Sequence, residues 1–285
     1  MRISDLNTLN RVLADPDKTY RSLPFWGWND RLDPAELRRQ MADMKRVGLG
    51  GCFSHSRDGL ETPYLSEEWM EDTRVMADEG KKQDLEVWIY DEDKWPSGAA
   101  GGVVAAADPA RFTAKGLTLE LAPWTDEAPE TGENCTVIGT WRADVDDATI
   151  LSFGTGGSRI TLRCERARKH EWYNGSAPSD NLNPDAVRKY IELTHEAYKK
   201  EFPDGLSRHV EGFFTDEPNC YDFFSFFTPG RPWIPWTEDF AAALRLGAAT
   251  IPCRCCRICS LAARAANASA TITGARSASC SASAI

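Results

Sequence analysis

The chain has 285 residues, 42% of them hydrophobic and 27% charged, which suits one full β/α barrel or two ordinary globular domains. Its net charge of −10 disfavours nucleic acid and anionic membranes, because both attract basic surfaces. Without a long apolar run or a signal-type start, we expect a cytoplasmic protein that does not contact membranes. A carbohydrate or another small molecule is compatible with this composition, and the oligomeric state is left open.

Short apolar segments alternate with segments of helical pattern. Residues 4–14, 33–48, 66–83 and 184–202 are expected to be helices, with Asp33 and Ser66 capping two of them. Residues 23–28, 49–54, 85–90 and 209–214 are expected to be buried strands. Such alternation is typical of a parallel sheet covered by helices. The predicted fold class is therefore α/β, the first four β/α units of a (β/α)8 TIM-type barrel.

Residues 108–172 interrupt this alternation with four β-rich segments separated by turn residues, which predicts a small antiparallel β insertion. The expected organisation is the first part of the barrel at residues 1–107 and the insertion at 108–172. The barrel continues at residues 173–246 with a helix and the fourth strand.

Residues 247–285 differ sharply in composition from the rest. They contain no Asp, Glu or Lys and hold five of the nine cysteines, four of them crowded between Cys253 and Cys259. One interpretation is a cysteine-rich metal site, but zinc sites favour well-spaced pairs or a later His. The other is a non-native, frameshifted and unstructured tail, which we favour because the segment lacks core-forming periodicity.

Polar and aromatic residues follow all four predicted strands, at the edge where parallel β/α folds bind ligands. A solvated loop, or a buried core position for each Trp, is the alternative for any one of them. Because four strand ends carry such groups in register, we expect a shared binding edge. Its candidate substrate-binding residues are Trp26, Trp28, Asn29, His55, Arg57, Glu61, Asp91, Glu92, Asp93 and Trp95.

Glu217 and Asp216, after the fourth strand, are the candidate catalytic residues. Glu217 follows an apolar strand and precedes a proline, and apolar walls would raise the pKa of its carboxyl as a general acid requires. Hydrolysis of a glycoside needs two carboxylates, and the second could come from residues 91–93 or from a strand not seen here. Oxygen ligands from Asp91, Asp93 and Glu217 could also hold a divalent cation such as calcium.

Several segments resemble the catalytic barrel of glycoside hydrolase family 106-like proteins, over about residues 20–240. These are PFWGWN at 24–29, MKRVGLGGCFSH at 44–55, GLETPYLSEEW at 59–69, WIYDEDKWPSG at 88–98, YNG at 173–175, LNP at 182–184 and FTDEP at 214–218. The resemblance implies a (β/α)8 barrel and, in the type family, an α-L-rhamnosidase with paired acidic residues and calcium as a candidate cation. It also adds Asn174 to the substrate-binding candidates.

These observations predict a glycoside hydrolase that acts on a sugar or oligosaccharide and is inactive as a truncated chain. The alternative is a non-catalytic carbohydrate-binding relic or pseudogene product. In an open half-barrel we expect the interior positions near Phe53, Ile89 and Phe213 to be exposed.

Overall fold

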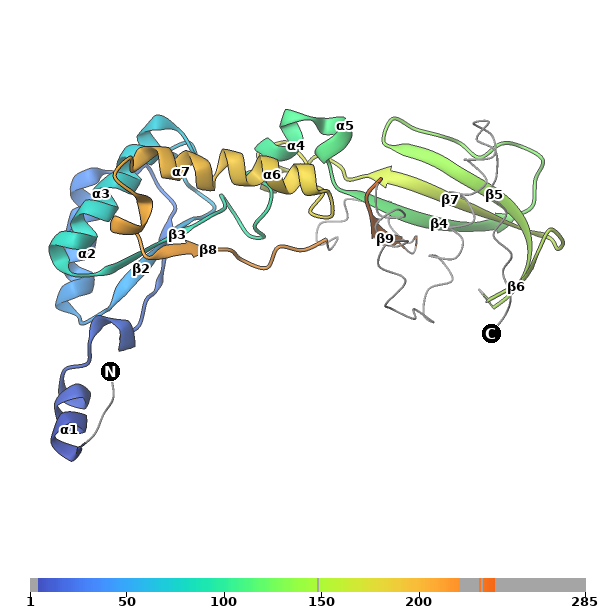
Figure 1. Cartoon of the computed structure of the whole chain (residues 1–285). Helices are drawn as coiled ribbons and strands as arrows, with labels where there is room; N and C mark the ends of the chain where they lie inside the picture. Colours follow the sequence, from blue (N-terminus) through green and yellow to red (C-terminus); the bar gives the residue numbers. More distant parts are fainter. Residues whose placement is uncertain (1–4, 148, 221–230, 232, 239–285) are drawn as a thin grey trace. The chain divides into compact units, whose positions relative to one another are not determined.

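The computed structural model describes residues 5–147, 149–220, 231 and 233–238, and it divides into two compact units (Figure 1). The first unit comprises Met1–Thr113 and Lys169–Tyr221, and the second comprises Ala114–Arg168 and Asp222–Ile285. The predicted tail at residues 247–285, including its possible metal site, lies outside the described residues. Among the helices that are described, none is long and apolar enough to cross a bilayer.

The first unit contains a four-stranded sheet in the order β1-β2-β3-β8, with parallel pairing throughout. The strands are β1 (Phe25–Trp28), β2 (Gly51–Ser56), β3 (Glu86–Tyr90) and β8 (Gly212–Phe214). The predicted parallel pairing of these four segments is confirmed, although β8 is shorter than the predicted 209–214, since His209 still has αR backbone as the cap of a 3-10 turn, η3 (Leu206–Arg208). A TIM-type barrel stays a prediction.

Two helices of this unit, α2 and α3, begin at the predicted caps. Asp33 accepts a hydrogen bond from the Glu36 backbone N–H, and Ser66 accepts one from Trp69, which confirms both predicted N-caps. The helices and remaining 3-10 turns are α1 (Leu6–Ala14), η1 (Lys18–Tyr20), α2 (Pro34–Arg46), α3 (Glu67–Gln83), α4 (Val103–Ala107), α5 (Pro109–Phe112), η2 (Glu171–Tyr173), α6 (Pro184–Leu193) and α7 (His195–Glu201).

The prediction of one helix over residues 184–202 is wrong, because the helix breaks at Thr194 into α6 and α7. Thr194 has φ −108° and ψ −83°, and its hydroxyl donates to the Tyr190 carbonyl at 2.7 Å. A threonine hydroxyl that bonds the preceding turn offers the backbone an alternative to regular helix, a competition that helical periodicity does not reveal.

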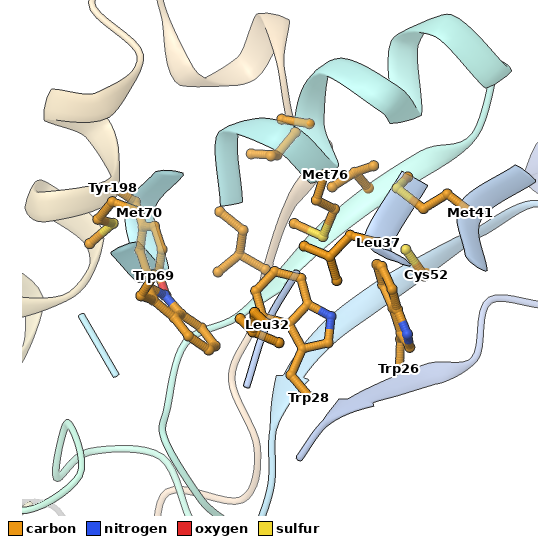
Figure 2. Packing of buried hydrophobic residues seen from close by; sticks show 14 of the residues in the cluster. Trp26, Trp28, Leu32, Leu37, Met41, Cys52, Trp69, Met70, Met76 and Tyr198 are labelled. Carbon is orange, nitrogen blue, oxygen red and sulfur yellow. The ribbon is translucent and has the colours of Figure 1, made fainter. Parts of the chain in front are cut away.

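One face of the parallel sheet packs against α2, α3 and α7, and Figure 2 shows part of this core. Trp26 and Trp28 from β1 lie there with Leu37 and Met41 of α2 and Trp69 of α3. Burial of large apolar groups of this kind stabilises a fold by roughly 1.5–3 kcal/mol each. Helix and strand are thus joined by one continuous apolar layer.

The same core corrects the expected exposure of two barrel-interior positions. Ile89 is fully buried on the helix-covered face, and Phe213 packs against the same cluster, in ring contact with Tyr198. Successive strand residues point to opposite faces, so Phe53 and Ile89 could not share one. Phe53 lies instead among the aromatic rings of the other face of the sheet. Its ring centroid is 5.3 Å from that of Phe25 and 5.3 Å from that of Phe214.

The second unit contains an antiparallel sheet in the order β6-β5-β7-β4-β9. Its strands are β4 (Lys115–Pro123), β5 (Cys135–Asp146), β6 (Thr149–Phe153), β7 (Ser158–Arg166) and β9 (Trp233–Trp236). The antiparallel β-rich insertion is therefore present, with narrower limits than residues 108–172. Trp233–Trp236 was expected to belong to the barrel continuation, but it pairs with β4 because its apolar residues complete the Leu117 and Leu162 core.

Candidate functional site

Three consecutive acids follow β3, and the first of them, Asp91, is completely buried. Its Oδ1 accepts a hydrogen bond from Ser97 Oγ at 2.6 Å, its Oδ2 accepts one from Thr215 Oγ1 at 2.5 Å, and His195 Nε2 lies 3.3 Å from Oδ2. Burial raises the pKa of Asp91, but the hydrogen bonds outweigh it and hold the pKa below its usual value. Asp91 is therefore an ionised anchor inside the protein, not a group exposed to substrate.

Glu92 is also buried, with an exposed fraction of 1%, and its carboxylate is enclosed by backbone. Its two oxygens accept hydrogen bonds from the backbone N–H groups of Asp93 and of residues 98–101. Burial raises the pKa of Glu92 to about 7, while these N–H groups act in the opposite direction. The predicted substrate-binding role is thus at odds with its position, because its acceptor sites are taken up by the loop.

The loop that Glu92 holds has an unusual backbone. Ala100 adopts φ +49°, a left-handed conformation that is uncommon for a residue with a side chain. Gly98 has φ +128°, a conformation that favours glycine, and a Cβ there would lie 2.4 Å from Asn181 Oδ1, so the Asn181 side chain would have to shift. The buried Glu92 carboxylate holds the loop at residues 98–101 in this conformation. The loop in this conformation places Ser97 and Gly101 beside the candidate site.

Asp93, Arg57 and Asn174, three predicted binding residues, line one pocket of about 560 Å³. Asp93 accepts hydrogen bonds from Ser56 Oγ at 2.6 Å and from Asn174 Nδ2 at 2.9 Å. Lys94 lies in the same lining, with its Nζ 3.3 Å from Asn174 Oδ1 and 3.7 Å from Asp93 Oδ2. The pocket therefore offers both cationic donors and carboxylate acceptors, the groups that recognise sugar hydroxyls.

The two predicted catalytic carboxylates lie in the residues that follow β8, called here the acidic turn (residues 215–217). Asp216 is half-buried and its Oδ2 accepts a hydrogen bond from the Tyr90 hydroxyl at 2.7 Å. Glu217 is exposed, has φ +42°, and accepts a hydrogen bond from Trp95 Nε1 at 3.2 Å. Among the residues that the structure describes, no apolar side chain encloses Glu217, which follows the strand into an exposed position.

His55 and Tyr90 form a stacked pair beside Asp216. Their ring centroids are 3.6 Å apart at an interplanar angle of 13°. Burial lowers the pKa of His55 to about 4, so its ring is neutral at pH 7. Burial and the Asp216 carboxylate raise the pKa of Tyr90 well above its usual value, so the phenol stays a hydrogen-bond donor.

Two of the predicted binding residues, Trp26 and Trp28, lie in the core, and two others are at the surface. Trp26 and Trp28 are in the helix-covered core, with exposed fractions of 8% and 2%, so neither ring face is open to a sugar. Trp26 Nε1 is occupied by Gln40 Oε1 at 2.7 Å. Asn29 and Glu61 are exposed, Asn29 directly after β1 and Glu61 in the loop after β2. The prediction that Trp26 and Trp28 bind substrate is therefore wrong, because their alternation in β1 places both side chains on the core face of the sheet.

The cation site suggested by Asp91, Asp93 and Glu217 does not form among the described residues. No group of three or more His, Cys, Asp or Glu side chains in that part of the chain could hold a metal ion. The physical reason is that Asp91 and Asp93 are committed to separate hydrogen-bond partners, whereas Glu217 faces solvent.

Several residues that shape this edge were not predicted. Tyr90, Lys94 and Ser97 stand within the segment at 88–98 already singled out, and their place directly before or after the three acids is a signal that could have found them. His195, which reaches Asp91, and Trp172, whose Nε1 donates to the Trp95 carbonyl at 2.6 Å, come from distant segments without a local pattern.

No protein-family model matches the chain, and no curated protein matches it. A solved structure of a rhamnosidase from Novosphingobium sp. PP1Y is similar to part of it, with 24% sequence identity and a TM-score of 0.31. The similarity covers 44% of this chain and 12% of that protein, so this chain spans a small part of the protein it resembles.

Proposed function

We propose that this chain belongs to the catalytic part of a glycoside hydrolase, with its four parallel strands forming part of a (β/α)8-type barrel. The observation that carries the proposal is the acidic turn. Two adjacent carboxylates leave the carboxyl end of a parallel strand, and each accepts a hydrogen bond from an aromatic side chain, Tyr90 for Asp216 and Trp95 for Glu217. Such strand ends are where β/α folds bind substrates, and paired carboxylates are what glycoside hydrolysis needs.

In this proposal Glu217 is the general acid. Its exposed carboxyl would give a proton to the oxygen of the glycosidic bond as that bond breaks, which supports departure of the leaving group. Asp216, held by Tyr90, would supply negative charge beside the developing positive charge on the sugar ring, and water would add to that ring carbon to complete the hydrolysis. An α-L-rhamnoside is the finer part of the proposal, and it rests on the segments that resemble glycoside hydrolase family 106-like proteins.

The test is hydrolysis of a panel of aryl glycosides, including the α-L-rhamnoside, by the full chain, and turnover would also overturn the expectation from the sequence that the chain is inactive as truncated. We expect release of the aryl group to require Glu217 and to be unaffected by Glu71→Gln, which alters an exposed carboxylate on α3. A folded chain that hydrolyses none of the panel would contradict the proposal.

Sugar binding without turnover is the second candidate, and the pocket favours it. Among the described residues, its lining includes Arg57, Asp93, Lys94 and Asn174 but leaves out Asp216 and Glu217. A sugar could therefore bind there independently of the acidic turn. Titration with rhamnose and other monosaccharides, followed by calorimetry, separates the two: Asn174→Ala should weaken binding, whereas Glu217→Gln should not.

A further inference from the structure

A chain of hydrogen bonds joins the loop after β3 to the acidic turn after β8. Asp91 accepts hydrogen bonds from Ser97 Oγ and from Thr215 Oγ1. Ser97 then binds Asp216 twice: its backbone N–H donates to the Asp216 carbonyl, and its hydroxyl oxygen accepts from the Asp216 backbone N–H, both at 2.9 Å. Ser97 Oγ is thus both a donor to Asp91 and an acceptor from Asp216.

The central residues of this series of hydrogen bonds are shielded from water. The exposed fractions of Asp91 and Ser97 are 0% and 1%, whereas Thr215 and Glu217 are exposed. Hydrogen bonds to a buried charged group are stronger and more directional than those at a surface. The buried pair can therefore fix the orientation of a turn whose Thr215 and Glu217 are exposed.

Glu217 depends on the same loop at both ends. The backbone before it is held by Ser97, and its carboxylate accepts from Trp95 Nε1, two residues earlier in that loop. Its φ of +42° is a conformation that a glutamate rarely adopts without support from its surroundings. Asp91 thus acts on Glu217 through Ser97 and Thr215.

We infer that Asp91 and Ser97 are positioning residues that orient the carboxylates of the acidic turn. The catalytic consequence rests on the proposed glycoside hydrolase function, whereas the orientation itself is a property of the fold. A shift of the turn would break the Trp95–Glu217 hydrogen bond first, because that bond is exposed and spans the loop and the turn. The indole N–H of Trp95 is therefore a reporter that needs no substrate.

The experiment compares ¹⁵N-indole NMR spectra of the full chain and its variants, with the Trp95 signal assigned by its loss in Trp95→Phe. Ser97→Ala and Thr215→Val each remove one hydroxyl, and Thr215→Ser keeps the hydroxyl as the matched control. We expect the first two variants to move the Trp95 signal and speed its solvent exchange up to about tenfold, the factor that one hydrogen bond supports. Thr215→Ser should keep the wild-type signal.

An unchanged Trp95 signal in both Ser97→Ala and Thr215→Val would overturn the inference, provided that circular dichroism shows them folded. An equal shift in Thr215→Ser would also overturn it, since the hydroxyl would then be irrelevant. If the chain hydrolyses an aryl glycoside, Thr215→Val should lower kcat with little change in KM, and Thr215→Ser should restore kcat. A chain that shows the NMR shift without hydrolysis supports the positioning role and counts against the proposed function.

Discussion

The acids after β3 and the acids after β8 have similar sequences and opposite environments. Residues 91–93 are all buried, and each carboxylate accepts hydrogen bonds from inside the protein. Asp216 and Glu217 leave the sheet at the same edge, but Asp216 is half-buried and Glu217 is exposed. The comparison shows that a row of acids at a strand end can build a site as well as perform its chemistry, and that hydrogen-bond donors decide which.

The largest expected effect is on turnover. In Glu217→Gln the side chain keeps its shape but can no longer give up a proton, so we expect kcat on an aryl glycoside to fall by about 10²–10⁴-fold. Substrates with better leaving groups need less protonation and should be affected less. Steady-state kinetics checks this, with Glu71→Gln as the control, and turnover within a few-fold of wild type would remove Glu217 from the mechanism.

The buried acids should respond in stability instead. The Asp91 carboxylate accepts hydrogen bonds from the Ser97 and Thr215 hydroxyls, and in Asp91→Asn one of its oxygens becomes an NH2 group, which can only donate. We expect this change to lower the free energy of unfolding by about 3 kcal/mol at pH 7. Because the folded-state pKa of Asp91 is lowered, its stabilisation is present above the unfolded value and is lost as the pH falls below it.

Urea unfolding of Asp91→Asn and Glu217→Gln at pH 7 measures the contrast. Glu217→Gln should stay within about 0.5 kcal/mol of wild type, as surface substitutions do. If both variants lose the same free energy of unfolding, the distinction between buried and exposed acids is wrong.

The strands could be predicted from the sequence because short apolar runs and capping residues are local signals. Trp26 and Trp28 were assigned to the site for the same local reason, their place near a strand end, yet alternation in β1 puts both in the helix-covered core. The alternation of residues along a strand predicts which side chains share a face of the sheet, but it does not predict which face the helices cover.

The roles of the acids could not be predicted locally. Residues 98–101 fold back over Glu92, and Asp91 takes partners from two distant segments, Thr215 and His195 of α7. Sequence motifs thus located the edge at which Asp216 and Glu217 lie, while the distinction between supporting and exposed acids depends on tertiary contacts.

His55 connects the two regions through its stack on Tyr90, and it predicts a pH dependence. Its folded-state pKa of about 4 is below the unfolded value, so the unfolded chain binds the proton more readily. The corresponding stability is present above about pH 6.5 and is lost as the pH falls toward 4, by about 2 kcal/mol. The difference in unfolding free energy between wild type and His55→Gln should shrink over this window.

The control for His55 is His170→Gln, at a histidine outside the His55–Tyr90 stack, where the acid dependence should be retained. If the wild-type curve and the His55→Gln curve stay parallel from pH 6.5 to 4, protonation of His55 does not destabilise the fold.

The smallest expected effect concerns Asp72 on α3, a buried acid without the donors that hold Asp91. Its exposed fraction is 2%, and its Oδ2 has no hydrogen-bond partner among the described residues. Burial, followed by the nearby acids of which Glu68 is the largest contributor, raises the pKa of Asp72 to about 6. Because the folded state then holds the proton more tightly than the unfolded chain, stability falls as the pH rises from about 4 to 6.

Asp72→Asn removes this charge and should stabilise the protein by about 1 kcal/mol at pH 7 but not at pH 4. Thermal unfolding at the two pH values measures the difference, and Asp78→Asn, at an exposed position of the same helix, should change it little. Destabilisation by Asp72→Asn at pH 7 would mean that Asp72 is held by donors as Asp91 is, and that burial alone does not separate the two kinds of acid.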